Sequence, residues 1–159
     1  MDYRIEKATK NDIPRLIDYK LKTIFEYAKE LSMEEIDNIH DYVKRHVPIQ
    51  LENYKIIYHN SDKIGCLLVE SKDDGVLLNE IYLEESYRDK GIGTDIIRTV
   101  ILKNNTVYLF VYKSNVRAVS LYLKLGFRMI EETETRYYMK HSNSERDYSE
   151  SYHNLHKLQ

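Results

Sequence analysis

The sequence has little of several residue types: one cysteine, two prolines, five glycines and no tryptophan among 159 residues. The single cysteine, Cys66, cannot form a disulfide within the chain, which favours a reducing compartment. With so few prolines and glycines there is no flexible linker, and we expect helices and strands joined by short turns.

Long apolar runs and an excess charge are also missing. No run approaches the roughly 20 residues of a membrane span, and the N-terminal segment MDYRIEKATK lacks the apolar core of a secretory signal. We therefore expect a cytoplasmic protein. The 24 basic and 26 acidic residues are well mixed, so charge favours neither nucleic acid nor a membrane surface as partner. The hydrophobic fraction, 42%, is enough for one globular core.

The first fifty residues predict one strand and two helices. Residues 3–8 alternate as in a strand, and apolar residues recur at helical spacing over 13–28, with Pro14 in the first turn. A capping box, Ser32-Met33-Glu34-Glu35, opens a second helix. We expect that helix to end at Pro48.

From residue 54 onward the period is mostly that of strands. The predicted strands are 54–59, 64–71, 76–83, 106–112, 127–131 and 136–140, and the predicted helices are 91–103 and 115–125. Gly126 is expected to end the second of these helices. The run 65–69 is apolar on both faces, as in a central strand. The predicted order βααβββαβαββ is a mixed α/β architecture.

The polar segment 141–159 follows a predicted domain of residues 1–140. Its composition predicts a solvated tail. Tyr148, Tyr152 and Leu155 lie at helical spacing, so a short docking helix is the alternative.

A glycine turn between a strand and a helix is the most informative segment. The strand ends at Leu83, and Gly91 and Gly93 open the helix. Helix N-termini present free N–H groups and a partial positive charge, and glycine lets those amides approach a phosphate. Arg88 and Lys90 add positive charge. The turn therefore suits an anion, and a plain loop with two permissive glycines is the alternative.

Three phosphate-binding motifs compete for this turn. A P-loop needs Gly-x-x-x-x-Gly-Lys-Ser/Thr, which does not occur in the sequence, and a dinucleotide fingerprint needs a third glycine where Ile96 stands. The third motif, Arg/Gln-x-x-Gly-x-Gly/Ala, is satisfied by Arg88, Gly91 and Gly93. It resembles the pyrophosphate loop of the GNAT acetyltransferases.

A second segment strengthens this resemblance. Residues 115–127 are similar to the family's pattern Asn-x-x-Ala-x-x-Leu-Tyr-x-x-x-Gly-Phe, and the spacing from Gly93 leaves room for one helix and one strand. The resemblance covers about residues 3–140. It implies the GNAT acyltransferase fold, a mixed central sheet with helices on both faces, and an enzyme that moves an acetyl group from acetyl-CoA to an amine.

The resemblance also implies where acetyl-CoA binds. The cosubstrate should lie in a gap where the strand ending at Leu83 separates from the strand ending near Tyr112. The implied contacts are the backbone of Ile81, Tyr82 and Leu83, the amides of Arg88, Asp89, Lys90, Gly91, Ile92, Gly93 and Thr94, and the residues Asn115 and Ala118. Glu85 departs from the proline that many members carry there, which affects a turn.

Acetyl transfer to an amine needs a base for the amine, a donor to the carbonyl oxygen and a proton for the leaving thiolate. By resemblance, Tyr122 is the acid, and the backbone N–H of Leu83 or a near neighbour is the oxyanion donor. Glu80 is the candidate base, since burial can raise a carboxylate pKa toward neutrality. The alternatives are a packing tyrosine and a solvated or salt-bridged glutamate.

The remaining chemistry is less specific. Six histidines show no metal-ligand spacing, so we expect no metal, and Cys66 is read as a small core residue rather than a nucleophile. Charges of both signs over 11–52, the expected acceptor wall, leave the acceptor as the primary amine of an unidentified small molecule or peptide. A homodimer stays open. The alternative function is a non-catalytic acyl-CoA sensor or interaction domain of the same fold.

Overall fold

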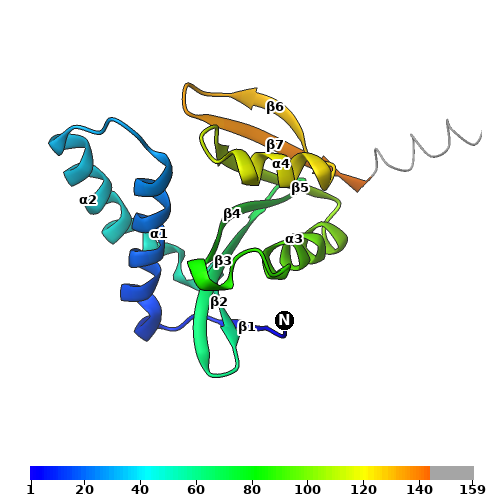
Figure 1. The fold of residues 1–159 in the computed structure, drawn as a ribbon, viewed down its shortest axis with the longest axis horizontal. Helices are drawn as coiled ribbons and strands as arrows, with labels where there is room; N and C mark the ends of the chain where they lie inside the picture. Colours follow the sequence, from blue (N-terminus) through cyan, green and yellow to red (C-terminus); the bar gives the residue numbers. More distant parts are fainter. Residues whose placement is uncertain (144–159) are drawn as a thin grey trace, which may run out of the picture.

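Seven strands form one mixed sheet in residues 1–143, the part of the chain that the structure, a computed structural model, describes (Figure 1). The strands are β1 (Arg4–Lys7), β2 (Tyr54–His59), β3 (Asp62–Lys72), β4 (Gly75–Leu83), β5 (Thr106–Tyr112), β6 (Arg128–Glu132) and β7 (Arg136–Ser142). Their order across the sheet is β1-β2-β3-β4-β5-β7-β6. Within these residues β4 and β5 are parallel, and the other neighbours are antiparallel.

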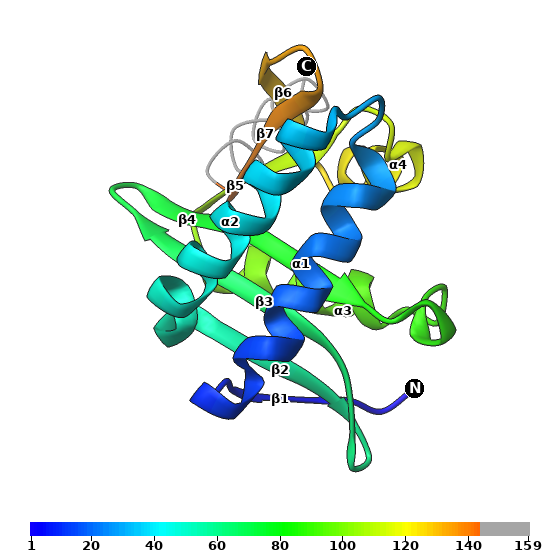
Figure 2. The same cartoon turned by 90° about the vertical axis from the view of Figure 1, so that its left-hand side faces the viewer.

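Two helices cover each face of the sheet. Helices α1 (Ile13–Tyr27) and α2 (Met33–Gln50) lie side by side on one face, and α3 (Ile92–Lys103) and α4 (Val116–Lys124) lie on the other (Figures 1 and 2). The predicted order βααβββαβαββ and the mixed sheet with helices on both faces are confirmed.

Each face of the sheet has its own apolar core. Under α1 and α2 the buried residues are Leu16, Tyr19, Val43, Val47, Tyr54, Ile56, Cys66, Leu68 and Tyr82. Under α3 and α4 a larger core includes Ile92, Ile96, Ile97, Val107, Leu109, Tyr122, Phe127 and Met139. The central strand predicted at 65–69 is confirmed, since β3 is buried between β2 and β4.

The start of α2 is as predicted, but its end is not. Ser32 accepts a hydrogen bond from the Glu35 N–H, and the Glu35 carboxylate accepts one from the Ser32 N–H, which completes the capping box. The prediction that the helix ends at Pro48 is wrong, because α2 continues to Gln50. Proline removes a single helical N–H, and the carbonyl that loses this partner belongs to exposed Lys44, where water can replace it.

Strand β4 changes the face that it presents at Asn79. Leu68 of β3 pairs with Glu80 and Val69 pairs with Leu78, so Asn79 has no partner on β3 and forms a β-bulge. Before the bulge, Leu78 packs in the α3/α4 core. After it, Glu80 points toward α1 and α2. The extra residue thus sets the direction in which the carboxylate of Glu80 points.

The same point marks the end of pairing between β4 and β5. Val76–Leu78 pair with Val107–Leu109, and no pairs follow between Asn79–Leu83 and Phe110–Tyr112. The predicted separation of the strands ending at Leu83 and near Tyr112 is confirmed. These two unpaired segments form the rims of a gap in the sheet, which we call the β4/β5 gap.

Strand β7 runs to Ser142, two residues beyond the predicted end at Lys140. The tail or docking helix predicted around Tyr148, Tyr152 and Leu155 lies outside the described residues. Within residues 1–143, the helices are too short or too polar to cross a membrane.

Candidate active site

Helix α3 begins with backbone amides that the helix itself does not use. Its N-cap is Gly91, which offers no capping side chain, and the first helical bond joins the Asp95 N–H to the Gly91 carbonyl at 3.0 Å. The amides of Ile92, Gly93 and Thr94 precede that bond and have no carbonyl acceptor within the helix. This is the arrangement that binds phosphate at helix N-termini.

The two glycines of the turn differ in what requires them. Gly91 has φ +85°, a left-handed conformation that side chains strain, although a Cβ there would meet no other atom within 4 Å. At Gly93 a Cβ would meet only Leu83 Cδ1, at the ordinary contact distance of 3.6 Å. The fold therefore requires glycine at 91 but not at 93. It also places the first turn of α3 against the end of β4.

Arg88 ties this turn to the rest of the site. Its Nε donates to the Leu83 carbonyl at 2.8 Å, and its Nη1 lies 3.5 Å from the Glu26 carboxylate of α1. Its side chain is thus directed at β4 and α1. Asp89 takes φ +61° and is held by Arg117, whereas Lys90 is exposed.

The backbone of β4 has free groups on the gap side. The Glu84 N–H donates to Ile64 on the β3 side at 2.8 Å. Because successive backbone groups of a strand point to opposite sides, the N–H groups of Leu83 and Ile81 point toward the β4/β5 gap. Tyr82 points the other way and pairs with Cys66. The structure therefore places Ile81 and Leu83 on the gap by their backbone groups, and not Tyr82.

Glu80 lies in a buried polar cluster beneath α1. The residue is 8% exposed, and its Oε2 accepts a 2.5 Å hydrogen bond from the Tyr54 hydroxyl. The Cys66 thiol lies 3.5 Å from Oε1, and Lys20 Nζ lies 3.9 Å from Oε2. Burial raises the pKa of Glu80, and the Lys20 charge and the two hydrogen bonds oppose that rise. A buried carboxylate with a raised pKa suits a general base. The contact with Lys20 also fits the alternative interpretation of Glu80, a salt-bridged glutamate.

One partner of Glu80 was weakly signalled by the pattern of apolar residues, and the other was not signalled at all. Lys20 lies four residues after Leu16 and four before Ile24, so it interrupts the apolar stripe of α1 with a cation. Tyr54 is one of 15 tyrosines and stands out in no way. Burial of Cys66 agrees with its reading as a core residue, and burial also raises the pKa of its thiol.

Tyr122 lies on the opposite face of the sheet from Glu80. The residue is 8% exposed, in the α3/α4 core, and its ring packs edge-on against Phe127. Burial, with a smaller contribution from Tyr27, raises the pKa of Tyr122 to about 12. A phenol with that pKa keeps its proton at neutral pH and can donate it. The β4/β5 gap opens the sheet between the faces that carry Tyr122 and Glu80.

Asn115 and Ala118 have a role within the fold itself. Asn115 is the N-cap of α4, and its side-chain oxygen accepts a hydrogen bond from the Ala118 N–H at 3.3 Å. This cap accounts for the asparagine without a ligand. A cofactor contact of either residue remains a prediction.

The last turn of α1 spans both rims of the gap. On the β4 side Glu26 meets Arg88, and on the β5 side the Ser114 hydroxyl donates to the Tyr27 carbonyl at 2.9 Å. The ring of Tyr27 also stacks near that of Tyr112, 6.1 Å between centroids. The helix therefore covers the gap from the face that carries Glu80. Residues 1–143 hold no cluster of three metal-ligating side chains.

Comparison with known proteins identifies the family. The family described as an acetyltransferase (GNAT) domain matches residues 50–129, half of the chain, including Glu80, the glycine turn and Tyr122. The chain belongs to the GNAT acetyltransferase family. The resemblance inferred from the two sequence motifs is confirmed.

Curated relatives match over shorter stretches. A spermine/spermidine N(1)-acetyltransferase of Bacillus subtilis strain 168 is 24% identical over 92 residues, which are 49% of this chain and 60% of the relative. YobR, an uncharacterized N-acetyltransferase of the same organism, is 44% identical over 64 residues, 37% of this chain and 26% of YobR. The matches span less than two thirds of either relative.

Solved structures share the GNAT fold over nearly the whole described region. The PaiA N-acetyltransferase from Thermoplasma acidophilum, in complex with coenzyme A, has a TM-score of 0.72 at 21% identity, covering 89% of this chain and 99% of that one. The apo form of YjaB from Escherichia coli has a TM-score of 0.68 at 15% identity, covering 88% and 97%.

Proposed function

We propose that this GNAT protein is an acetyl-CoA-dependent N-acetyltransferase that moves the acetyl group directly to a primary amine. The observation that carries the proposal is the β4/β5 gap lying beside the uncapped N-terminus of α3. Phosphates of the cosubstrate would bind the free amides of that turn, and an extended arm would pair with an unpaired strand edge, as an added strand does.

The cosubstrate contacts follow from this placement. The amides of Ile92, Gly93 and Thr94 would hold the pyrophosphate, and Gly93 gives it close access. The outward backbone groups of Ile81 would pair with the pantetheine arm. Arg88 already donates to the Leu83 carbonyl, so the Leu83 N–H would remain for the acetyl group at the end of that arm. Bound acetyl-CoA supplies the activated acetyl group.

Three groups of the chain would perform the transfer. Glu80 takes a proton from the acceptor ammonium, directly or through water, so that the amine has a lone pair. The Leu83 N–H donates to the carbonyl oxygen as it gains charge. The amine nitrogen bonds to the acetyl carbon, and as the carbon–sulfur bond breaks Tyr122 gives its proton to the departing thiolate. The nitrogen then loses its second proton on becoming an amide, and that proton, passed directly or through water, restores the Tyr122 phenol.

A small molecule or a peptide could supply the acceptor amine. The name of the B. subtilis spermine/spermidine relative makes polyamines one set to assay, and peptides with a free N-terminus are the other. At 24% identity over half of the chain, the relative supports an amine acceptor in general.

The test separates catalysis from mere binding. We would incubate the protein with acetyl-CoA and an amine panel, and follow released thiol together with acetylated amine by mass spectrometry. Thiol release that depends on an amine and falls in Tyr122→Phe supports the transferase. Tight acetyl-CoA binding with no transfer to any amine would favour the acyl-CoA sensor instead.

A further inference from the structure

The candidate base already has a cation beside it. Lys20 Nζ lies 3.9 Å from Glu80 Oε2, and the Lys20 side chain is only 15% exposed. Tyr54 and Cys66 contact the same carboxylate, so α1, β2 and β3 each direct one group at it. An acceptor amine that gives its proton to Glu80 must do so next to the Lys20 charge.

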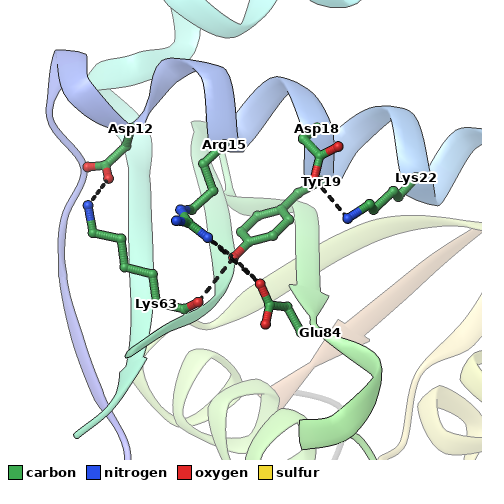
Figure 3. A network of polar contacts seen from close by, with 7 residues as sticks. All are labelled: Asp12, Arg15, Asp18, Tyr19, Lys22, Lys63 and Glu84. Carbon is green, nitrogen blue, oxygen red and sulfur yellow. Dashed lines mark hydrogen bonds and ion pairs between the residues drawn. The ribbon is translucent and has the colours of Figure 1, made fainter. Parts of the chain in front are cut away.

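Other carboxylates near the gap are paired as well. Glu26 lies 3.5 Å from Arg88 at the end of α1. Glu84, which follows β4, lies 3.8 Å from Arg15 and accepts a 3.1 Å hydrogen bond from Tyr19 (Figure 3). Each of these carboxylates thus already has a basic neighbour. A substrate ammonium could bind one of them only by displacing that neighbour, which costs the existing ion pair.

A groove between α1 and α2 carries no excess negative charge. An open groove of about 410 Å³ begins at Ile24, one turn beyond Lys20 on α1. Its other lining residues are on α2: Asn38, Ile39, Asp41, Tyr42 and Arg45. One acid and one base line it, so a second ammonium of a polyamine would find no net attraction there.

A fixed cation beside the base selects for amines that are easily neutral. A neighbouring like charge disfavours the protonated form of an amine. At pH 7.5 about a third of peptide α-amino groups, with pKa near 7.8, are already neutral, against about one in a thousand alkylamines of pKa near 10.4. Repulsion by the Lys20 charge therefore weakens binding mainly of the alkylamine, which is almost entirely protonated. A polyamine brings further ammonium groups near the same charge.

We propose that Lys20 is a specificity-determining residue that directs this enzyme toward the α-amino group of a peptide and against polyamines. The proposal rests on the transferase function above and names its acceptor class. The observations that carry it are the Lys20–Glu80 pair, the paired acids around the gap and the balanced groove.

The experiment compares two acceptors at pH 7.5 in the full chain: spermidine and a C-terminally amidated tetrapeptide with a free N-terminus and no lysine. We expect kcat/KM for the peptide to exceed that for spermidine at least tenfold. Lys20→Met should raise kcat/KM for spermidine about tenfold, chiefly by lowering KM. Lys20→Arg keeps the positive charge, so its ratio of peptide to spermidine kcat/KM should equal that of the wild type. Lys22→Met is the matched control, because Lys22 is exposed on the same helix and pairs with Asp18 (Figure 3).

A pH profile separates this role from a structural one. Lys20 lowers the pKa of Glu80, so Lys20→Met and Lys20→Gln should both move the acid limb of kcat/KM to higher pH. A packing role would leave that limb unmoved. We use both Lys20→Met and Lys20→Gln because the test then still works if one of the two variants folds poorly.

Calorimetric titration of acetyl-CoA accompanies each rate measurement. Spermidine preferred over the peptide, or an acceptor ratio unchanged in both neutral variants, with acetyl-CoA still bound, overturns the Lys20 assignment alone. Transfer to neither acceptor despite acetyl-CoA binding overturns it too. No acetyl-CoA binding by the wild-type chain overturns the transferase function and this inference with it.

Discussion

Gly93 tests the cosubstrate site with a single carboxylate. The fold has room for a Cβ at Gly93, and an acid suits a helix N-terminus, so Gly93→Asp should leave the free energy of unfolding unchanged or slightly higher. The carboxylate would stand at the first amides of α3 and repel a phosphate. We therefore expect acetyl-CoA affinity to fall at least tenfold, about 1.4 kcal/mol, by calorimetry.

The neighbouring glycine gives the matched control. Gly91→Ala must take φ +85° and should lose about 1–2 kcal/mol of stability in urea unfolding. If Gly93→Asp bound acetyl-CoA as the wild type does, phosphate would not approach this turn.

Tyr122 can be tested by removing a single oxygen. Tyr122→Phe keeps the edge-on packing against Phe127 and loses the proton donor. We expect kcat to fall about 100-fold or more with the Kd for acetyl-CoA unchanged. Tyr138→Phe, on the other face of the sheet, is the control and should leave kcat unaffected. Normal turnover in Tyr122→Phe would mean that Tyr122 only packs.

Glu80 predicts how activity depends on pH. A base must be ionised, so kcat/KM should fall as pH drops through the pKa of Glu80, which burial places above the usual 4.5. Glu80→Gln should lose this acid limb and lower kcat/KM by about 10²–10⁴-fold. Rates measured from pH 5 to 9 check both points, and an acid limb that persists in Glu80→Gln would assign the base elsewhere.

At the scale of elements, Asp12 joins the 3-10 turn that leads into α1 (Lys10–Asp12) to strand β3. The residue is 3% exposed and accepts a hydrogen bond from the Thr9 N–H at 2.8 Å. Its carboxylate pairs with Lys63 of β3 at 2.6 Å (Figure 3). Asp12→Asn should lower the free energy of unfolding by about 1–3 kcal/mol at pH 7 in urea titrations.

The pH dependence of that loss has a definite sign. The Lys63 and Thr9 contacts outweigh burial and hold the pKa of Asp12 below its ordinary 3.8. The Asp12 carboxylate therefore contributes stability above pH 3.8 that is lost as pH falls through its lower folded-state value. The difference between wild type and Asp12→Asn should shrink in acid, and a difference that grew there would contradict this account.

Sequence periodicity predicted the helices and strands, but not the face of the sheet toward which each side chain points. The apolar stripes of α1 and α3 and the capping box at Ser32 follow from local spacing, which is why they were predictable. The bulge at Asn79 depends on pairing with β3, a contact distant in sequence. A regular strand would place Leu78 and Glu80 on one face, so the direction of Glu80 could not be read from alternation.

The candidate site was predictable only where a motif fixes the backbone. The Gly91 and Gly93 pattern placed the turn, because a helix start needs only local residues. Lys20 and Tyr54 reach Glu80 from α1 and β2, and no sequence spacing encodes that meeting. Charge and the resemblance assigned Arg88 to the phosphate, which stays a prediction. No local spacing showed that its side chain would connect Leu83 to α1.

At the scale of the whole molecule, the two faces of the sheet meet at the β4/β5 gap. The face under α1 and α2 carries the candidate base, and the face under α3 and α4 carries the candidate acid and the phosphate turn. The last turn of α1 spans the gap between them. We therefore expect binding and chemistry to be separable by mutation, with Gly93 affecting the first and Glu80 and Tyr122 the second.

The central claim is that this gap binds acetyl-CoA, and calorimetric titration of acetyl-CoA into the purified chain tests it most directly. The account predicts one site with a micromolar Kd, bound more tightly than ATP or NAD. Absence of binding at millimolar acetyl-CoA would contradict it.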